Sequence, residues 1–102
     1  MSVPKLSKCE FFVLGQLLRA GKSYVYEIAL AASTTLTYPQ SDKAVGNALE
    51  QLRSKGLVQY VGLEESSKGP ARRYWKITED GEQAFRNEYG NQLKDLVSLY
   101  PL

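Results

Sequence analysis

The spacing of apolar residues changes its period at Gly56, and this change limits the folds open to the chain. Before Gly56, apolar residues recur every three or four positions, as they do along helices. In residues 57–63 and 72–77 they alternate, as in strands, and helical spacing then returns. The 102 residues are therefore predicted to form about one domain with three helices, a β-hairpin and a fourth helix, a mainly α arrangement of the α+β class.

Local signals predict the ends of the first two helices. Ser7 and the glutamate three residues later have the spacing of a capping box, so a first helix is expected over residues 9–21. Ser23 is expected to cap a second helix over residues 24–33. The segment 33–40 contains β-branched residues and a proline, which predict an extended connection to the third helix.

The third helix has the clearest boundaries. Ser41 is its expected N-cap, and Lys55-Gly56 is its expected end. One stripe of this helix is apolar and consists of Val45, Ala48, Leu49 and Leu52. The opposite face is polar and carries Lys43, Asn47, Glu50, Gln51 and Ser54. This face is either a binding surface or an ordinary solvated helix surface.

The alternating residues after Gly56 predict a hairpin with a long tip. Its strands are expected over residues 57–63 and 72–77, and a turn rich in Ser, Gly and Pro over residues 64–71. Trp75 and Ile77 share one face of the second strand and are predicted to lie in the core.

The last helix has a long apolar stripe. Thr78 is its expected cap, and the stripe consists of Phe85, Tyr89, Leu93, Leu96 and Tyr100. One small domain is too short to cover such a stripe. A two-fold homodimer is therefore predicted, with residues 79–102 as the dimerisation helix. The alternative is a helix folded back onto its own core.

Charge is divided unevenly along the chain. Residues 1–78 contain eleven Lys or Arg against six Asp or Glu, whereas residues 79–102 contain two against five. The first segment therefore suits an anionic partner. No apolar run approaches the ~20 residues that cross a bilayer, and the N-terminus lacks the apolar region of a secretory signal, so a cytoplasmic location is predicted.

Residue types needed for catalysis or metal binding are scarce. The chain has no histidine, a single cysteine and no glycine-rich phosphate loop. Cys9 lies in an apolar helical stretch and is predicted to be a buried structural thiol. No metal site, cofactor or enzyme activity is predicted.

Three helices followed by a hairpin is the winged-helix arrangement, in which the third helix enters the DNA major groove and the hairpin is the wing. Residues 1–78 are therefore predicted to be a winged-helix DNA-binding domain that forms one compact unit with the helix of residues 79–102. The chain also resembles PadR-type transcriptional regulators from about residue 12 to residue 85, through "LGQLLRAGKSYVYEI", "ALEQLRSKGLV" and "KGPARRYWKITEDG". The last piece is the most specific, because a Gly-Pro pair leads through a basic residue and aromatics to a Thr-x-x-Gly corner. MarR-like winged helices are the nearest rival, but their wing lacks this combination.

Three residues depart from the family pattern. Tyr24-Val25 stands where the family usually has His-Gly, and Gly46 stands where it has a tyrosine in the third helix. Because this helix carries sequence readout, the departures concern the operator rather than the fold. Gly46 either permits close approach of the backbone to DNA or is a tolerated defect.

The resemblance implies a DNA-binding repressor that works as a homodimer through its C-terminal helix. Such a dimer is expected to bind double-stranded DNA at an inverted repeat. The residues expected to contact DNA are Ser41, Lys43, Asn47, Gln51, Lys68, Arg72 and Arg73. Strand alternation directs Arg72 outward and leaves Arg73 the more structural of the two, facing an acid such as Glu64 or Glu65 across the hairpin.

Two further possibilities accompany this interpretation. A winged helix can serve as a protein-interaction or architectural module without a specific operator, although the basic wing argues against it. Some relatives bind small aromatic effectors at the dimer interface. Here such a pocket would be lined by Phe11, Trp75, Tyr89 and Tyr100, for which aromatic core packing is an equal explanation.

Overall fold

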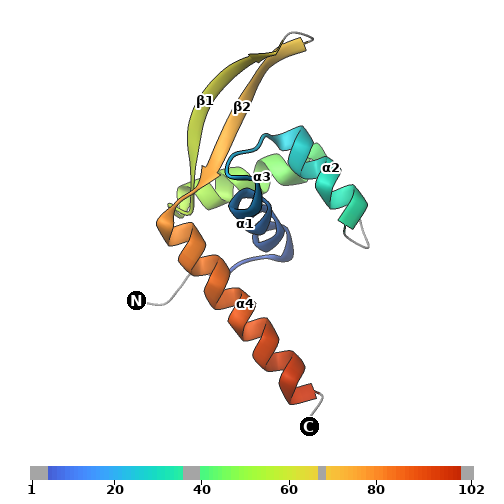
Figure 1. Cartoon of the computed structure of the whole chain (residues 1–102), viewed down its shortest axis with the longest axis vertical. Helices are drawn as coiled ribbons and strands as arrows, with labels where there is room; N and C mark the ends of the chain where they lie inside the picture. Colours follow the sequence, from blue (N-terminus) through green and yellow to red (C-terminus); the bar gives the residue numbers. More distant parts are fainter. Residues whose placement is uncertain (1–4, 36–39, 67–68, 100–102) are drawn as a thin grey trace.

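A computed structural model describes residues 5–35, 40–66 and 69–99, apart from the side chains of residues 35, 65, 66, 69, 70 and 95–99. Its elements follow in the order α1 (Lys8–Ala20), α2 (Val25–Thr35), α3 (Asp42–Ser54), β1 (Val58–Ser66), β2 (Gly69–Ile77) and α4 (Glu79–Leu99). This order confirms the predicted α+β winged-helix arrangement. In Figure 1 the hairpin and the end of α4 project from opposite ends of a body formed by α1, α2 and α3.

The predicted boundaries of α1 and α3 are confirmed by hydrogen bonds. Ser7 Oγ accepts a hydrogen bond from the Glu10 N–H at 3.1 Å, and the Glu10 carboxylate accepts one from the Ser7 N–H at 3.0 Å. Helix α1 ends at Ala20 and is capped by Gly21, whose φ of 84° suits a residue without a side chain. Ser41 caps α3 by accepting a hydrogen bond from a first-turn N–H at 3.1 Å.

The predicted start of α2 is wrong. The helix begins at Val25, and Ser23 lies outside it with a different role. The Ser23 hydroxyl donates to the Glu27 carboxylate at 2.5 Å, while the Ser23 backbone forms an isolated antiparallel bridge with Trp75 of β2. Pairing with a strand that is distant in the sequence therefore replaces the predicted cap.

Helix α2 also ends later than predicted, at Thr35 instead of residue 33. The hydroxyls of Ser33 and Thr34 donate to carbonyls of the preceding turn, which accommodates these residues within a helix. Most of the predicted extended connection, residues 36–39, lies outside the described residues.

The hairpin is longer than predicted. β1 and β2 pair antiparallel from Val58 with Ile77 out to Ser66 with Gly69, so most residues of the predicted turn belong to the strands. Irregular register at two places bends β1, and Gly62, with a φ of 147°, lies at one of them. The ladder of hydrogen bonds overrides the local turn preference of Ser, Gly and Pro.

The core lies between α1, α2, α3 and the base of the hairpin. The predicted apolar stripe of α3 is buried, and so are Trp75 and Ile77, which confirms both predictions. The largest fully buried aliphatic side chains come from the first three helices and are Leu14, Leu17, Ile28, Leu49 and Leu52. The hairpin base is thus rooted in the same core as the helices.

A tight corner joins the hairpin to α4. Thr78 Oγ1 accepts a hydrogen bond from the Gly81 N–H at 3.0 Å and donates one to the Gly56 carbonyl at 2.8 Å, while the Thr78 N–H donates to the Leu57 carbonyl at 3.0 Å. A Cβ at Gly81 would lie 2.0 Å from the Leu57 oxygen. The predicted cap is confirmed, and the geometry explains why threonine and glycine occupy this corner.

A partly buried ion pair ties α1 to the end of α3. Lys55 Nζ donates to the Glu10 carboxylate at 2.7 Å. Burial raises the pKa of Glu10, but the hydrogen bonds from Lys55 and Ser7 outweigh it and hold the pKa below its usual value. The pair positions the junction from which β1 departs.

Candidate nucleic-acid interface

The polar face of α3 is exposed along its length. Lys43, Asn47 and Gln51 follow one another at intervals of four residues, and all three are exposed. Ser41, which is also exposed, stands at the N-terminal end of the same helix. The structure therefore places the four predicted α3 residues on one helix, where amide and ammonium groups face away from the core.

Gly46 borders this face, and no packing requirement explains it. A Cβ added at Gly46 would meet no atom within 4 Å, and the helix continues through the residue without a positive φ. The glycine thus leaves a length of α3 backbone uncovered beside Lys43 and Asn47.

Glu50 forms an ion pair within α3. Its carboxylate pairs with the Arg53 guanidinium one turn further along, at 3.4 Å. Both residues, together with Tyr60, Arg73 and Trp75 from the hairpin, line a shallow depression between α3 and the sheet. Arg73 therefore extends the positive charge of the hairpin toward α3.

The two adjacent arginines have different surroundings. Both are exposed, but the Arg72 guanidinium carbon lies 4.6 Å from the ring centroid of Tyr24. Glu64, named as a partner for Arg73, pairs instead with Lys22, so that part of the prediction is wrong. The side chain of Glu65 and all of Lys68 lie outside the described residues.

Sequence reasoning missed the turn before α2. Lys22 and Tyr24 from this turn contact the hairpin through Glu64, Arg72 and Tyr74. A hydrogen bond with Glu64 raises the pKa of Lys22. In the sequence, Lys22 and Tyr24 flank Ser23 as they would in a short strand, with their side chains on the face opposite to that of Ser23. Three residues are too few to predict a strand from this pattern.

The predicted dimerisation stripe of α4 divides into two parts. Phe85 stacks on Phe11 of α1 with ring centroids 4.7 Å apart, so the start of α4 is folded back onto the core. Tyr89 and Leu93, in contrast, are 53% and 46% exposed. The side chain of Leu96, and Tyr100, lie outside the described residues. The folded-back alternative thus describes the start of the helix, and the dimer contact of the exposed part stays a prediction.

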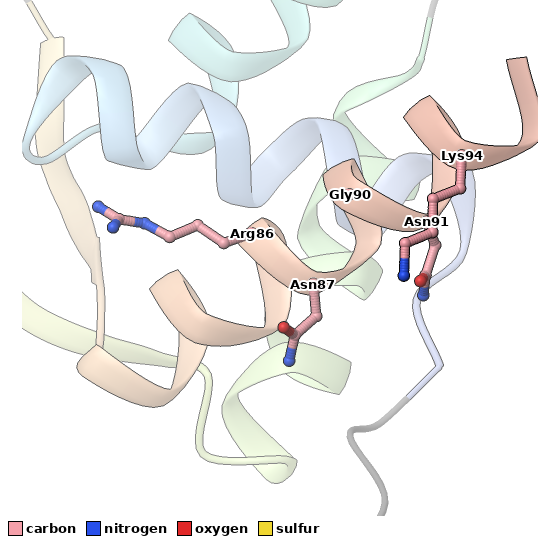
Figure 2. A pocket seen from close by; sticks show the side chains of 5 residues that line it. All are labelled: Arg86, Asn87, Gly90, Asn91 and Lys94. Carbon is pink, nitrogen blue, oxygen red and sulfur yellow. The ribbon is translucent and has the colours of Figure 1, made fainter. Parts of the chain in front are cut away.

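A second exposed face of α4 is polar. Figure 2 shows a shallow pocket along the helix, lined by Arg86, Asn87, Gly90, Asn91 and Lys94. In helical projection Asn87, Asn91 and Lys94 lie on a different side from Tyr89 and Leu93, whereas Arg86 lies beside Leu93. Among the α4 side chains that the structure describes, the large exposed apolar ones, Tyr89 and Leu93, therefore form one stripe.

Two of the four aromatic residues predicted to line an effector pocket pack in or against the core instead. Trp75 is 6% exposed, and Phe11 is covered by Phe85. Tyr89 remains exposed next to Phe85. Cys9 is half-buried, and burial raises the pKa of its thiol, as expected for a structural residue.

Within the described ranges, no group of three or more His, Cys, Asp or Glu residues could hold a metal ion. Among the same residues, no helix has the length and apolar character needed to cross a membrane.

A model of the PadR-like family of transcriptional regulators matches residues 13–87. No curated protein matches the sequence significantly.

Solved structures share the fold. A transcriptional regulator from Clostridium thermocellum is 23% identical, with 91% of this chain and 92% of that chain covered and a TM-score of 0.67. A PadR family regulator from hypervirulent Clostridium difficile R20291 is 18% identical, with 92% and 98% covered and a TM-score of 0.72. Bacillus subtilis PadR, solved in complex with operator DNA, is 17% identical, with 78% and 46% covered and a TM-score of 0.69.

Proposed function

The chain belongs to the PadR-like family of transcriptional regulators, and we propose that it is a repressor that binds an inverted-repeat operator as a homodimer. Members of this family are DNA-binding regulators and not enzymes, and a PadR from Bacillus subtilis is known in complex with operator DNA. The observation that carries the proposal is the exposed row of Lys43, Asn47 and Gln51 on α3.

The chemistry of this row suits base edges. Asn47 and Gln51 carry amides that can bind adenine bidentately in the major groove, and Lys43 can reach guanine or a phosphate. Ser41 and the backbone amides at the start of α3 offer donors to a phosphate. The Arg53 guanidinium, 3.4 Å from the Glu50 carboxylate, offsets part of the negative charge on this face.

The hairpin supplies further positive charge. Arg72, the third predicted contact of the hairpin, lies over the Tyr24 ring. Lys68 and Arg73 are proposed to approach the DNA backbone or minor groove, where they add affinity more than sequence choice. Of these, Arg73 is supported by its position beside α3, since the depression between the two elements contains it.

The homodimer is proposed to form through the exposed part of α4. Tyr89 and Leu93 are apolar and exposed on a helix that projects from the body (Figure 1). Packing two copies of this stripe together would bury it and place two α3 helices on one DNA duplex, with half-sites about one turn, ~34 Å, apart. A small aromatic effector near Tyr89 remains a prediction.

Selection of bound fragments from random double-stranded DNA tests the proposed function. The selected site is expected to be an inverted repeat. The double variant Lys43→Ala, Asn47→Ala should weaken binding to it at least tenfold, since each lost base contact costs about 1–3 kcal/mol. Lys94→Ala, which removes an exposed lysine from the polar face of α4, is the matched control and should bind normally. If no sequence is enriched over bulk DNA, a protein-interaction or architectural role replaces the proposal.

Sedimentation equilibrium tests the dimer separately. Leu93→Glu should give a monomer, because a carboxylate would be placed in the apolar contact. Asn91→Glu adds the same charge on the polar face and should leave the dimer intact. If both variants remain dimeric, α4 does not form the interface at this stripe.

A further inference from the structure

Five side chains join the turn before α2 to the outer hairpin, the part of β1 and β2 beyond the Tyr60–Trp75 pair. The Arg72 guanidinium lies over the Tyr24 ring at 4.6 Å, and the Tyr24 ring meets the Tyr74 ring edge-on at 5.3 Å. The ammonium of Lys22 lies 4.8 Å from the Tyr74 ring centroid and forms an ion pair with Glu64. We call this set of Lys22, Tyr24, Glu64, Arg72 and Tyr74 the hairpin clamp.

The backbone explains why these side chains meet. The Ser23 N–H donates to the Trp75 carbonyl at 3.0 Å, and the Trp75 N–H donates to the Ser23 carbonyl at 2.8 Å. Ser23 and Trp75 are both buried, so alternation turns their neighbours Tyr24 and Tyr74 to the opposite face. The short bridge thus sets the register in which the clamp forms.

Among the described side chains, those of β1 beyond Tyr60 are largely exposed. Val61 and Leu63 of β1 are 49% and 61% exposed, so the strand makes few core contacts there. Glu64 and Arg72 are opposite each other in the hairpin register, three residues of β2 outward from the buried Trp75. The clamp therefore extends the attachment of the hairpin outward from the Ser23–Trp75 bridge.

The clamp also distinguishes the two arginines. Arg72 stacks on Tyr24 on one face of β2, whereas Arg73 lines the depression toward α3 with Glu50 and Arg53. Arg73 is consequently the arginine on the side of the proposed DNA-reading helix.

We propose that the clamp sets the position of the hairpin relative to α3, and that Arg72 is a positioning residue whereas Arg73 contacts a DNA phosphate. The assignment of Arg73 rests on the proposed function, but the clamp itself does not. The charged side chains of the clamp are exposed and its two tyrosines are half-buried, so each contact is individually weak. Its loss is expected to loosen the outer hairpin without unfolding the protein.

Hydrogen exchange in the DNA-free protein tests the clamp. Tyr24→Leu, which removes the aromatic ring, should speed exchange of the amides in residues 61–64 and 71–74 several-fold while leaving α3 unchanged. Tyr24→Phe keeps the ring and should exchange like the natural protein. Glu64→Gln, which breaks the pair with Lys22, is a second variant and should produce a smaller change of the same kind. Unchanged exchange in both Tyr24→Leu and Glu64→Gln would overturn the clamp.

Salt dependence of DNA affinity tests the two arginines, with the DNA site enriched from the random pool as probe. Loss of a phosphate contact lowers the slope of log affinity against log salt by about 0.9 per contact. Arg73→Ala should lower the slope in this way. Arg72→Ala and Tyr24→Leu should weaken binding about three- to tenfold with the slope unchanged, since they displace the hairpin and remove no phosphate contact.

The two tests fail independently. A slope that falls equally for Arg72→Ala and Arg73→Ala would overturn the positioning role of Arg72. If the natural protein binds no DNA, the proposed function and the role of Arg73 fall together, whereas the exchange result still decides whether the clamp exists.

Discussion

The two ends of the hairpin are held in different ways. At the base, Val58, Trp75 and Ile77 are buried in the core, and Thr78 fastens the chain to two backbone carbonyls. Further out, Val61 is exposed, and the described contacts with the rest of the body come from the side chains of the clamp. One pair of strands is therefore held by core packing at one end and by side-chain contacts at the end proposed to meet DNA.

The largest expected effect comes from breaking the base at its tightest point. Gly81→Ala would place a methyl group 2.0 Å from the Leu57 oxygen and should reduce the free energy of unfolding by about 3 kcal/mol, measured by urea denaturation. Gly46→Ala is the control, because nothing lies within 4 Å there, and it should stabilise α3 by about 0.5–1 kcal/mol. Comparable losses in the two variants would mean that the corner is not tightly packed.

The junction that leads into the base depends on Glu10. Glu10→Gln should lower the free energy of unfolding by about 1.5–3 kcal/mol at pH 7, because it weakens a charged hydrogen bond to Lys55. The pKa of Glu10 is lower in the folded protein than its usual 4.5, so the pair stabilises the fold above that pH and loses its effect as the pH falls through the folded-state pKa. Denaturation at several pH values should show the difference between the two proteins shrinking below pH 4.5. A constant difference would contradict this assignment.

A valine-to-threonine substitution can be made both at the buried base of β1 and at its exposed outer part, so that the two ends of the hairpin are compared with the same chemical change. Val58→Thr buries a hydroxyl at a position that is 3% exposed and should cost about 1–3 kcal/mol. Val61→Thr, on the same strand but 49% exposed, should change stability by less than about 0.5 kcal/mol. Thermal unfolding of the two variants measures the contrast, and equal shifts would show that the outer strand shares the core.

The smallest expected effect at the base concerns the cap. Thr78→Val removes the hydroxyl that accepts from Gly81 and donates to Gly56, and should cost about 1 kcal/mol in denaturant unfolding. Thr78→Ser keeps the hydroxyl and is expected to retain most of the stability. Equal losses in both variants would assign the effect to the methyl group instead.

Much of the fold was predictable because its signals are local. The caps at Ser7, Ser41 and Thr78 act over three residues, and the alternation around Trp75 reflects the geometry of a single strand. The exposed row on α3 follows in the same way from the spacing of its apolar stripe. These features depend on neighbours in the chain, which the sequence displays directly.

The sequence by itself therefore determined the order of elements, their caps and the polar face of α3. Only the tertiary structure decided that Ser23 pairs with Trp75, that Arg72 stacks on Tyr24, and that the apolar stripe of α4 is partly covered by α1. The first two contacts join segments about fifty residues apart, and the third joins the first and last helices. Which side chains meet across such separations depends on how complete elements pack, and local spacing carries no record of that packing.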